Sequence, residues 1–86
     1  MLSMILGILL QTTEAAAKAN FAEFGAALVA LGAAYGISKI GVSAMEAIAR
    51  QPEASGDIRS NLIVSAALIE GVCFFAVIVC ALILFV

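Results

Sequence analysis

The sequence of 86 residues contains no histidine or tryptophan and only one proline, and only 12% of its residues are charged. That share of charge is about half of what soluble domains carry. Four lysines and arginines stand against six acidic residues, so there is no basic surface for the phosphates of a nucleic acid. Hydrophobic residues, in contrast, make up 65% of the chain. A soluble chain this short cannot bury so many, which excludes a soluble enzyme domain and a disordered chain and predicts a protein in lipid.

Cysteine is scarce as well, with only Cys73 and Cys80. On a helix, a spacing of seven residues puts them on one face about 10 Å apart along the axis. A disulfide needs Cα atoms within about 7 Å, so the two cannot be joined within one helix. Without histidine or a Cys-x-x-Cys pair, the sequence predicts neither a metal site nor a bound cofactor. We interpret both cysteines as small apolar filler.

Two long apolar stretches, residues 24–49 and 62–86, flank a polar segment that contains Pro52. Each stretch exceeds the roughly 20 residues that a helix needs to cross a bilayer, and only helices satisfy their backbone groups within a single segment in lipid. Pro52 cannot continue the first helix, and Ser55 or Asp57 can cap the second. The prediction is one all-α membrane domain, a hairpin of two transmembrane helices over 21–49 and 58–86 with a polar loop over 50–57.

Residues 1–20 precede this hairpin as an N-terminal extension. Their first ten residues are largely apolar but too few to span a bilayer. A signal peptide cleaved near Ala15-Ala16-Ala17 is one alternative, although no basic residue precedes the apolar run. We favour an extension that continues the first helix. Arg50 and Arg59, at the two ends of the loop, predict that the loop faces the cytoplasm and both termini face outward.

The first helix is rich in small side chains, which leave one side of it nearly free of bulk. They are Gly25, Ala26, Ala27, Ala30, Gly32, Ala33, Ala34, Gly36 and Ser38. Helices in lipid associate through close packing of such residues, so the pattern predicts contact between copies of the chain, in particular at Gly32, Ala34, Gly36 and Ser38. The alternative is that glycine and alanine are simply common in membrane helices. The second helix is bulky and suits a layer that faces lipid.

Glu70 is the residue that carries chemistry. It lies nine positions into the second apolar stretch, where a charge is costly. Either Glu70 takes up a proton, because lipid favours the neutral carboxyl, or a cation or hydrogen bonds hold the carboxylate. In both cases its proton affinity depends on its surroundings, as a proton carrier requires. The other interpretation is a structural carboxyl bonded across the helix pair, and we favour the functional one.

Lys39 is the second charge deep in an apolar stretch. A hairpin centred between Ala54 and Ser55 brings Lys39 and Glu70 to similar depths, where they can form an ion pair that fixes the carboxylate. Alternatively, Lys39 lies on another face and snorkels toward the loop, or meets a lumen or headgroups. We favour the second alternative. Glu46, one turn from the loop, is interpreted as a solvated interfacial charge.

The sequence resembles the c subunit, or proteolipid, of F-type ATP synthases over residues 24–86. Ala49-Arg50-Gln51-Pro52-Glu53-Ala54 is similar to the polar loop of that family. The alternate small residues from Gly32 to Ser38 resemble its glycine motif, with alanine and serine in place of two glycines. Glu70, within Ala67-Leu68-Ile69-Glu70-Gly71, stands where the family has its ion-carrying carboxylate.

The resemblance implies a ring of identical hairpins in the bacterial inner membrane, with the first helix inside and the second outside. Glu70 would load an ion beside subunit a, travel round the ring and release the ion near the stator arginine. Arg50, Gln51 and Pro52 would contact the central stalk subunits gamma and epsilon. The chain would not be catalytic alone.

The resemblance also bears on the ion. Sodium-binding members have glutamine at the position of Ile37, serine at Gly71 and tyrosine at Phe75. All three oxygen-bearing side chains are missing here, and a site of Glu70 with a backbone carbonyl such as that of Leu68 offers sodium few oxygen ligands. We therefore expect proton coupling.

The sequence also allows two alternatives of other functional classes. One is a small holin-like or scaffolding membrane protein that oligomerises through its glycine-rich helix, with Glu70 structural. The other is a small proton-coupled exporter, for which two helices are few. Neither alternative requires the Arg50-Gln51-Pro52 segment.

Overall fold

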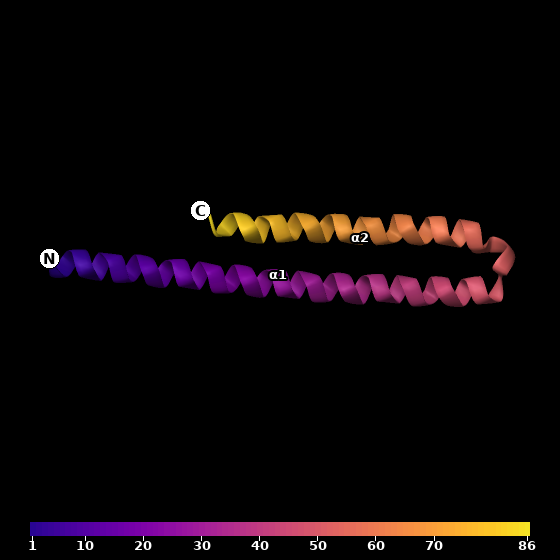
Figure 1. Cartoon of the computed structure of the whole chain (residues 1–86), viewed down its shortest axis with the longest axis horizontal. Helices are drawn as coiled ribbons and strands as arrows, with labels where there is room; N and C mark the ends of the chain where they lie inside the picture. The colour runs from indigo at the N-terminus through magenta and orange to yellow at the C-terminus, as the bar shows by residue number, and fades with distance from the viewer.

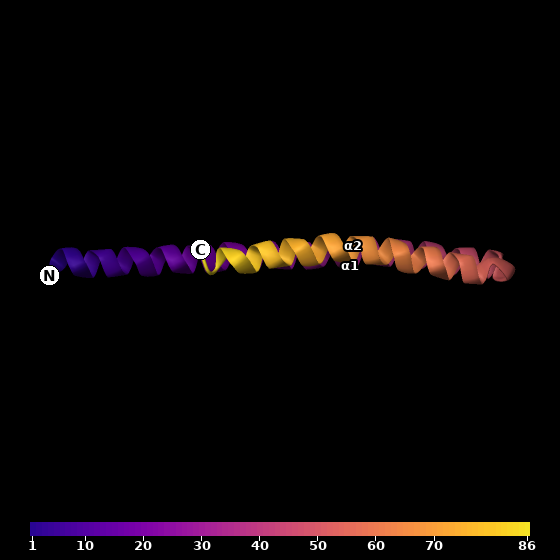
Figure 2. The same cartoon turned by 90° about the horizontal axis from the view of Figure 1, so that it is seen from above.

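The computed structural model describes residues 1–86 as two long helices joined by a tight turn. Helix α1 runs over Leu2–Arg50, the short 3-10 helix η1 over Pro52–Ala54, and helix α2 over Ser55–Ile83. The two long helices lie side by side as a hairpin (Figure 1), and the view from above shows a single layer (Figure 2). Both helices are long and apolar enough to cross a membrane. The predicted two-helix hairpin is confirmed.

Helix α1 is much longer than α2, with 49 residues against 29. It continues without a break through residues 1–20, so its N-terminal part projects beyond the C-terminus of the chain (Figure 1). The molecule is 76 Å long as a result. An apolar core of about 30 Å accommodates only part of α1. Polar residues from Gln11 to Glu23 lie between the apolar start of α1 and its membrane-spanning part.

The turn is shorter than the predicted loop of residues 50–57. Gln51 ends α1 by donating its backbone N–H to the carbonyl of Ala47 at 2.9 Å, and its φ of −134° leaves the helical region. A residue before proline avoids the helical conformation, and Pro52 then begins η1, where a missing N–H costs nothing. The Ala54 N–H donates to the carbonyl of Gln51 at 3.0 Å. The chain reverses direction within four residues.

The predicted cap of α2 is wrong. The N-cap residue is Ala54, and no side chain caps the helix. The N–H of Ser55 donates to the carbonyl of Pro52, so the chain passes directly from η1 into α2 and leaves no extended residue from which Ser55 could cap. Asp57 lies instead in the first turn, where its charge favours the helix dipole.

The two helices meet along a narrow seam of small residues. Ala22 and Ala44 are the only buried residues, with 4% and 8% of their surface exposed. A Cβ added to Gly36 would lie 3.2 Å from Cδ1 of Ile69, and one added to Gly25 would lie 3.1 Å from Sγ of Cys80. The absent side chains on α1 therefore allow α2 to approach closely. Most large apolar side chains remain exposed, so the hairpin alone does not bury its apolar surface.

The sequence pattern suggested that the small residues of α1 lie on one side of the helix. In the structure they do not. Gly36 and Gly25 face α2, whereas a Cβ on Gly32 would meet nothing within 4 Å, and Ala34 and Ser38 are exposed. The turn of about 100° per residue sends alternate positions to opposite sides of a helix, which separates Ala34 and Ser38 from Gly36. Gly32 is one turn from Gly36, but no atom of α2 comes within 4 Å of a Cβ added there. Small residues therefore serve the contact within the hairpin and are also left free on the outer surface of α1.

Candidate functional site

Glu70 lies close to the middle of α2, 15 residues after Ser55 and 13 before Ile83. At 1.5 Å per residue it is about 20 Å from either end of that helix. Because a bilayer core is about 30 Å thick, a carboxyl at this position sits near its centre when α2 spans it. Reaching that carboxyl from water requires a path through protein or lipid.

A groove of about 160 Å³ between the two helices runs beside Glu70. Seven of its eight lining residues are hydrophobic, and Glu70 is the exception. Val29, Ala30, Ala33 and Ile37 line it from α1, and Cys73, Phe74 and Val77 line it from α2. None of the other seven lining residues carries a charge.

No hydrogen bond from another side chain reaches Glu70. The three side-chain hydrogen bonds of the chain all lie within α1, from Thr12, Thr13 and Ser38 to backbone carbonyls one turn earlier. A structural carboxyl bonded across the helix pair is therefore not what this hairpin contains. Glu70 is exposed at the edge of the groove and is free to meet a neighbouring molecule.

Of the residues predicted to line the site, the single chain brings only Ile37 into the groove with Glu70. Leu68 and Phe75 are 68% and 70% exposed and are not part of the groove, and a Cβ on Gly71 would meet nothing within 4 Å. Leu68 and Phe75 stand two residues before and five residues after Glu70. On a helix these spacings point to a different side from that of Glu70.

Three groove residues of α2 follow Glu70 at helical spacing, which can be seen in the sequence alone. Cys73, Phe74 and Val77 follow Glu70 by three, four and seven positions, which places them on one face of the helix. Cys73 is a half-buried free thiol in the apolar wall of the groove, which is consistent with its interpretation as a small apolar residue. Applying the helical period to Glu70 could have identified all three.

Lys39 does not pair with Glu70 inside the hairpin. The contacts of Gly36 with Ile69 and of Gly25 with Cys80 share one register, because each pair is centred on the Pro52–Glu53 bond. In that register Glu70 is level with Tyr35, and Lys39 lies one turn nearer the loop. The hairpin centre assumed from the sequence was wrong, because the turn is shorter than predicted. The Lys39 ammonium instead lies 5.5 Å from the centre of the Tyr35 ring on α1.

The loop residues lie at the end of the hairpin opposite to both termini (Figure 1). Arg50 is the last residue of α1, Gln51 follows it, and Pro52 opens η1. All three are exposed. They therefore form a compact polar tip.

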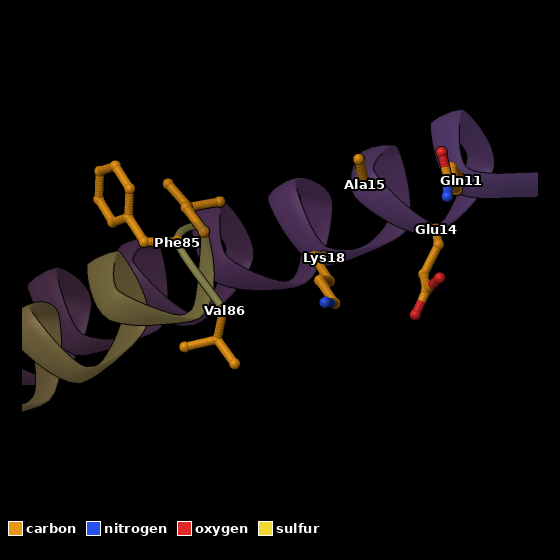
Figure 3. A pocket seen from close by; sticks show the side chains of 7 residues that line it. Gln11, Glu14, Ala15, Lys18, Phe85 and Val86 are labelled. Carbon is orange, nitrogen blue, oxygen red and sulfur yellow. The ribbon is translucent and has the colours of Figure 1, made fainter. Parts of the chain in front are cut away.

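A second hollow, of about 260 Å³, lies where the C-terminus of the chain meets the N-terminal part of α1 (Figure 3). Glu14 and Lys18 project to the same side of α1, and Val86 points to that side while Phe85 points away. The hollow marks the level at which α2 ends beside a polar stretch of α1. It holds no group of residues that could bind a metal, and none occurs elsewhere in the chain.

Comparison with known proteins bears directly on this site. The family model for the C subunit of ATP synthase matches residues 22–83, which include the seam, the turn and the groove with Glu70. The chain is 61% identical over 84 residues to the ATP synthase c subunit of Bacteroides thetaiotaomicron, covering 95% of this chain and 99% of the relative. Identity to the corresponding ATP synthase protein of Phocaeicola vulgatus is 59% over 83 residues, with the same coverage.

A more distant relative, the ATP synthase c subunit of Protochlamydia amoebophila, is 51% identical over 63 residues, covering 73% of this chain and 64% of that protein. No solved structure matches the chain. The match to the Bacteroides protein includes most of the residues before Ala22, outside the family model. The hairpin, the mid-helix carboxylate and these matches agree, and the chain belongs to the family of ATP synthase C subunits.

Proposed function

We propose that this protein is the proton-carrying subunit of the membrane rotor of an F-type ATP synthase, with Glu70 as the carrier. The observation that carries the proposal is the position of Glu70 near the middle of α2, at the edge of a groove that is otherwise apolar. A carboxyl there is neutral while lipid or apolar side chains surround it, and loses its proton when a cationic group or water approaches. Binding and release then follow from a change of surroundings alone.

The carrier site is completed between copies of the chain. Glu70 and Ile37 lie on one side of the hairpin, whereas Leu68 and Phe75 lie on another side of α2 and are exposed. In a ring, each copy presents one side to each of two neighbours. The exposed carboxyl of one copy then meets Leu68 and Phe75 of the next, and α1 contributes Gly32, Ala34 and Ser38 to the packing. We assign α1 to the inside of the ring and the bulkier α2 to the outside, where its exposed Phe75 and Ile78 can face lipid.

Rotation converts proton movement into work in this proposal. A proton enters from one side beside subunit a, Glu70 carries it round the ring, and the stator arginine of subunit a favours release on the other side. One charge crossing the membrane yields about 2.3 kcal/mol per 100 mV, so a single step supplies little and the rotor pools several. The chain contributes the moving carboxyl and not the catalytic chemistry of ATP formation.

The polar tip at the turn serves as the contact with the central stalk. Arg50, Gln51 and Pro52 are exposed there, where α1 ends and η1 begins. The subunits gamma and epsilon are the partners that we assign to this tip. The excess of arginine at the turn supports our assignment of the turn to the cytoplasmic side of a bacterial inner membrane and of both termini to the outer face.

The coupling ion in this proposal is the proton. A sodium ion needs several oxygen ligands in place of its water. The groove provides Glu70 as its one charged group, and none of the four residues that line it from α1, Ile37 included, has a side-chain oxygen. A proton needs only the carboxyl itself.

Labelling with dicyclohexylcarbodiimide, which attacks protonated carboxyls in apolar surroundings, tests the proposal. Membranes that contain the assembled protein are treated across a pH series with and without sodium, and the modified residue is identified by mass spectrometry. We expect labelling at Glu70 and not at Glu46, decreasing as pH rises because the carboxyl loses its proton, and unaffected by sodium. Glu70→Gln abolishes labelling and proton-driven ATP synthesis, whereas Glu46→Gln changes neither.

Two results would contradict the proposal in different ways. Protection of Glu70 by sodium would show that the ion is sodium and would leave the rotor intact. No labelling at any pH, with ATP synthesis unchanged in Glu70→Gln, would show a structural carboxyl and favour a scaffolding protein.

A further inference from the structure

The N-terminal end of the chain carries an apolar surface that lies outside the part matched by the family model. Eight of the first ten residues are large and apolar, and each is at least half exposed. They are Met1, Leu2, Met4, Ile5, Leu6, Ile8, Leu9 and Leu10. Helix α2 covers none of them, because α1 projects beyond the C-terminus of the chain (Figure 1). The carrier mechanism does not use this surface.

These residues lie well outside the hydrocarbon core when α2 spans it. Tyr35 is level with Glu70, and Leu10 precedes Tyr35 by 25 residues. That separation is about 37 Å along the helix. The core extends about 15 Å to either side of its centre, so Leu10 lies about 20 Å beyond its edge. A contiguous apolar surface in water marks an interface, and a partner must therefore cover this one.

One side of this segment is polar or small, and we call it the polar stripe. Its members follow one another at intervals of three or four residues, which places them on one face of α1. They are Ser3, Gly7, Gln11, Glu14 and Lys18. The same intervals lead from Lys18 to the buried Ala22 and to Gly25, which meets Cys80 of α2. The polar stripe therefore continues the side of α1 on which α2 lies, and Glu14 and Lys18 border the hollow at the C-terminus (Figure 3).

The other sides of the segment are apolar. With about 100° per residue, Ile8 lies on one flank of the polar stripe, Leu10 on the other flank, and Leu9 on the side opposite to the stripe. The hydroxyls of Thr12 and Thr13 donate to the carbonyls of Ile8 and Leu9, each at 2.9 Å, so they need no water. A helix in water with one polar stripe and two apolar flanks is suited to a neighbour on each flank.

We propose that residues 2–20 of neighbouring copies pack side by side into a collar, which extends the inner circle of the ring on the side of the membrane opposite to the turn. This inference rests on the proposed function, in which α1 is the inner helix. With α2 outside, the polar stripe faces water, both flanks meet a neighbour, and Leu9 faces the enclosed axis. Ala15, Ala17 and Ala19 lie on the flanks nearer the membrane, where their small side chains allow close approach.

The structure favours a second copy of the chain over other partners. Helix α1 is unbroken through this segment, and no proline or glycine occurs between Ile8 and Phe24. Sharp kinks arise at such residues, so the segment continues the direction of α1 and does not fold back onto the lipid surface. Since copies of α1 pack against each other in the ring, the same contact continues along the extension. A partner outside the ring would meet the polar stripe first.

Oxidative cross-linking tests the collar. The double variant Ile8→Cys with Leu10→Cys places one thiol on each flank. Membranes that contain the assembled protein are treated with copper phenanthroline, and the subunits are separated on denaturing gels without reductant. We expect a ladder of dimers, trimers and higher oligomers that the parent chain does not give, because each copy is joined to both neighbours. Gly7→Cys with Gln11→Cys, on the polar stripe, is the matched control and stays monomeric.

A charge placed on the segment gives a second measurement that does not depend on thiols. Leu9→Glu puts a carboxylate on the inward side of every copy, where like charges repel one another around the collar. Gln11→Glu adds the same charge two residues away, on the polar stripe. We expect Leu9→Glu to lower the temperature at which isolated rings dissociate in detergent and Gln11→Glu to leave that temperature unchanged.

Several results would overturn the collar. One is an Ile8→Cys, Leu10→Cys variant that stays monomeric in membranes whose rings are intact on native gels. Another is a subunit mass that lacks the residues up to Ala17, because the segment would then be a cleaved signal peptide. If the double variant does not assemble, Ala15→Cys with Ala17→Cys replaces it on the same two flanks, with the same expected ladder.

Carbodiimide labelling of Glu70 in the same membranes separates this inference from the proposed function. Intact rings with normal labelling and no ladder would contradict the collar alone. A ladder with no labelling of Glu70 would contradict the carrier alone. The absence of rings in the parent protein, together with the absence of labelling, would contradict both.

Discussion

The two helices of the hairpin use side-chain size in opposite ways. Where they meet, α1 contributes glycine and alanine, and at two positions it has no side chain at all against Ile69 and Cys80 of α2. Helix α2 is bulky on its outer side, where Phe75, Ile78 and Leu82 are exposed. Helix α1 thus sets how closely backbones approach, and α2 carries the carboxyl and faces outward. A substitution should therefore have an effect that depends on the helix and on the side it changes.

The largest effect is expected at Gly32, which is open within the chain. Gly32→Leu leaves the hairpin unchanged, because an added Cβ meets nothing within 4 Å. In a ring it places bulk where α1 of a neighbouring copy must approach closely, and overpacking of a tight contact costs about 1–3 kcal/mol at each repeated interface. We expect complete loss of rings on native gels, with the helix content of the monomer in detergent unchanged by circular dichroism.

Gly7→Leu is the matched control, since Gly7 also lies on α1 with open space around it but outside the hairpin contact. It makes the same change of helix propensity and should leave rings intact. Normal rings in Gly32→Leu would show that α1 does not pack between copies through this position.

An intermediate effect is expected when oxygen ligands are added around Glu70. Ile37→Gln adds an amide oxygen to the groove from α1, while Gly71→Ser and Phe75→Tyr add hydroxyls on other sides of α2. The triple variant should bind sodium, because a carboxylate with several neutral oxygens suits a hard cation. The measurement is the rate of carbodiimide labelling at constant pH, which sodium should slow in the triple variant and not in the wild type.

Ile37→Gln alone separates the contribution of one chain from that of the assembly. If the site is completed between copies, this single change gives little protection by sodium, and full protection needs the changes on α2. Full protection by Ile37→Gln alone would show that one hairpin holds the ion unaided.

Much of this arrangement could be predicted from the sequence, for identifiable reasons. Pro52 and the two apolar runs determine the helices and the reversal, because proline ends a membrane helix and lipid allows few alternatives. Glu70 was identifiable because charge is so rare in this chain. The register between the two helices could not be predicted. It depends on the length of the turn, and η1 makes the turn shorter than the polar segment suggests. In the structure, Lys39 therefore lies one turn nearer the loop than Glu70 and not level with it.

The directions of the small residues could not be predicted either. Gly32 and Gly36 are one turn apart and look equivalent in the sequence. The structure separates them, because only Gly36 meets a side chain of α2. The packing of both helices decides which side of α1 is covered by a partner helix. The sequence of α1 alone does not determine it. The same argument separates Ile37, which lies in the groove, from Leu68 and Phe75, which do not.

The smallest predicted effect tests the seam directly, at the pair of Gly25 and Cys80. The added methyl of Gly25→Ala would lie 3.1 Å from Sγ of Cys80, so the thiol must shift by a few tenths of an ångström. Cys80→Ala removes the sulfur and gives that methyl room. We expect the free energy of unfolding of the hairpin in detergent to show a favourable coupling of about 0.5–1 kcal/mol between the two changes, within the range known for residues in contact.

Cys73→Ala combined with Gly25→Ala is the control and should be additive, because Cys73 lines the groove beside Glu70 and does not contact Gly25. Additivity of the Gly25 and Cys80 changes would mean that α1 does not set the distance between the helices at this end, and the contrast between a small-residue α1 and a bulky α2 would then hold only near Gly36.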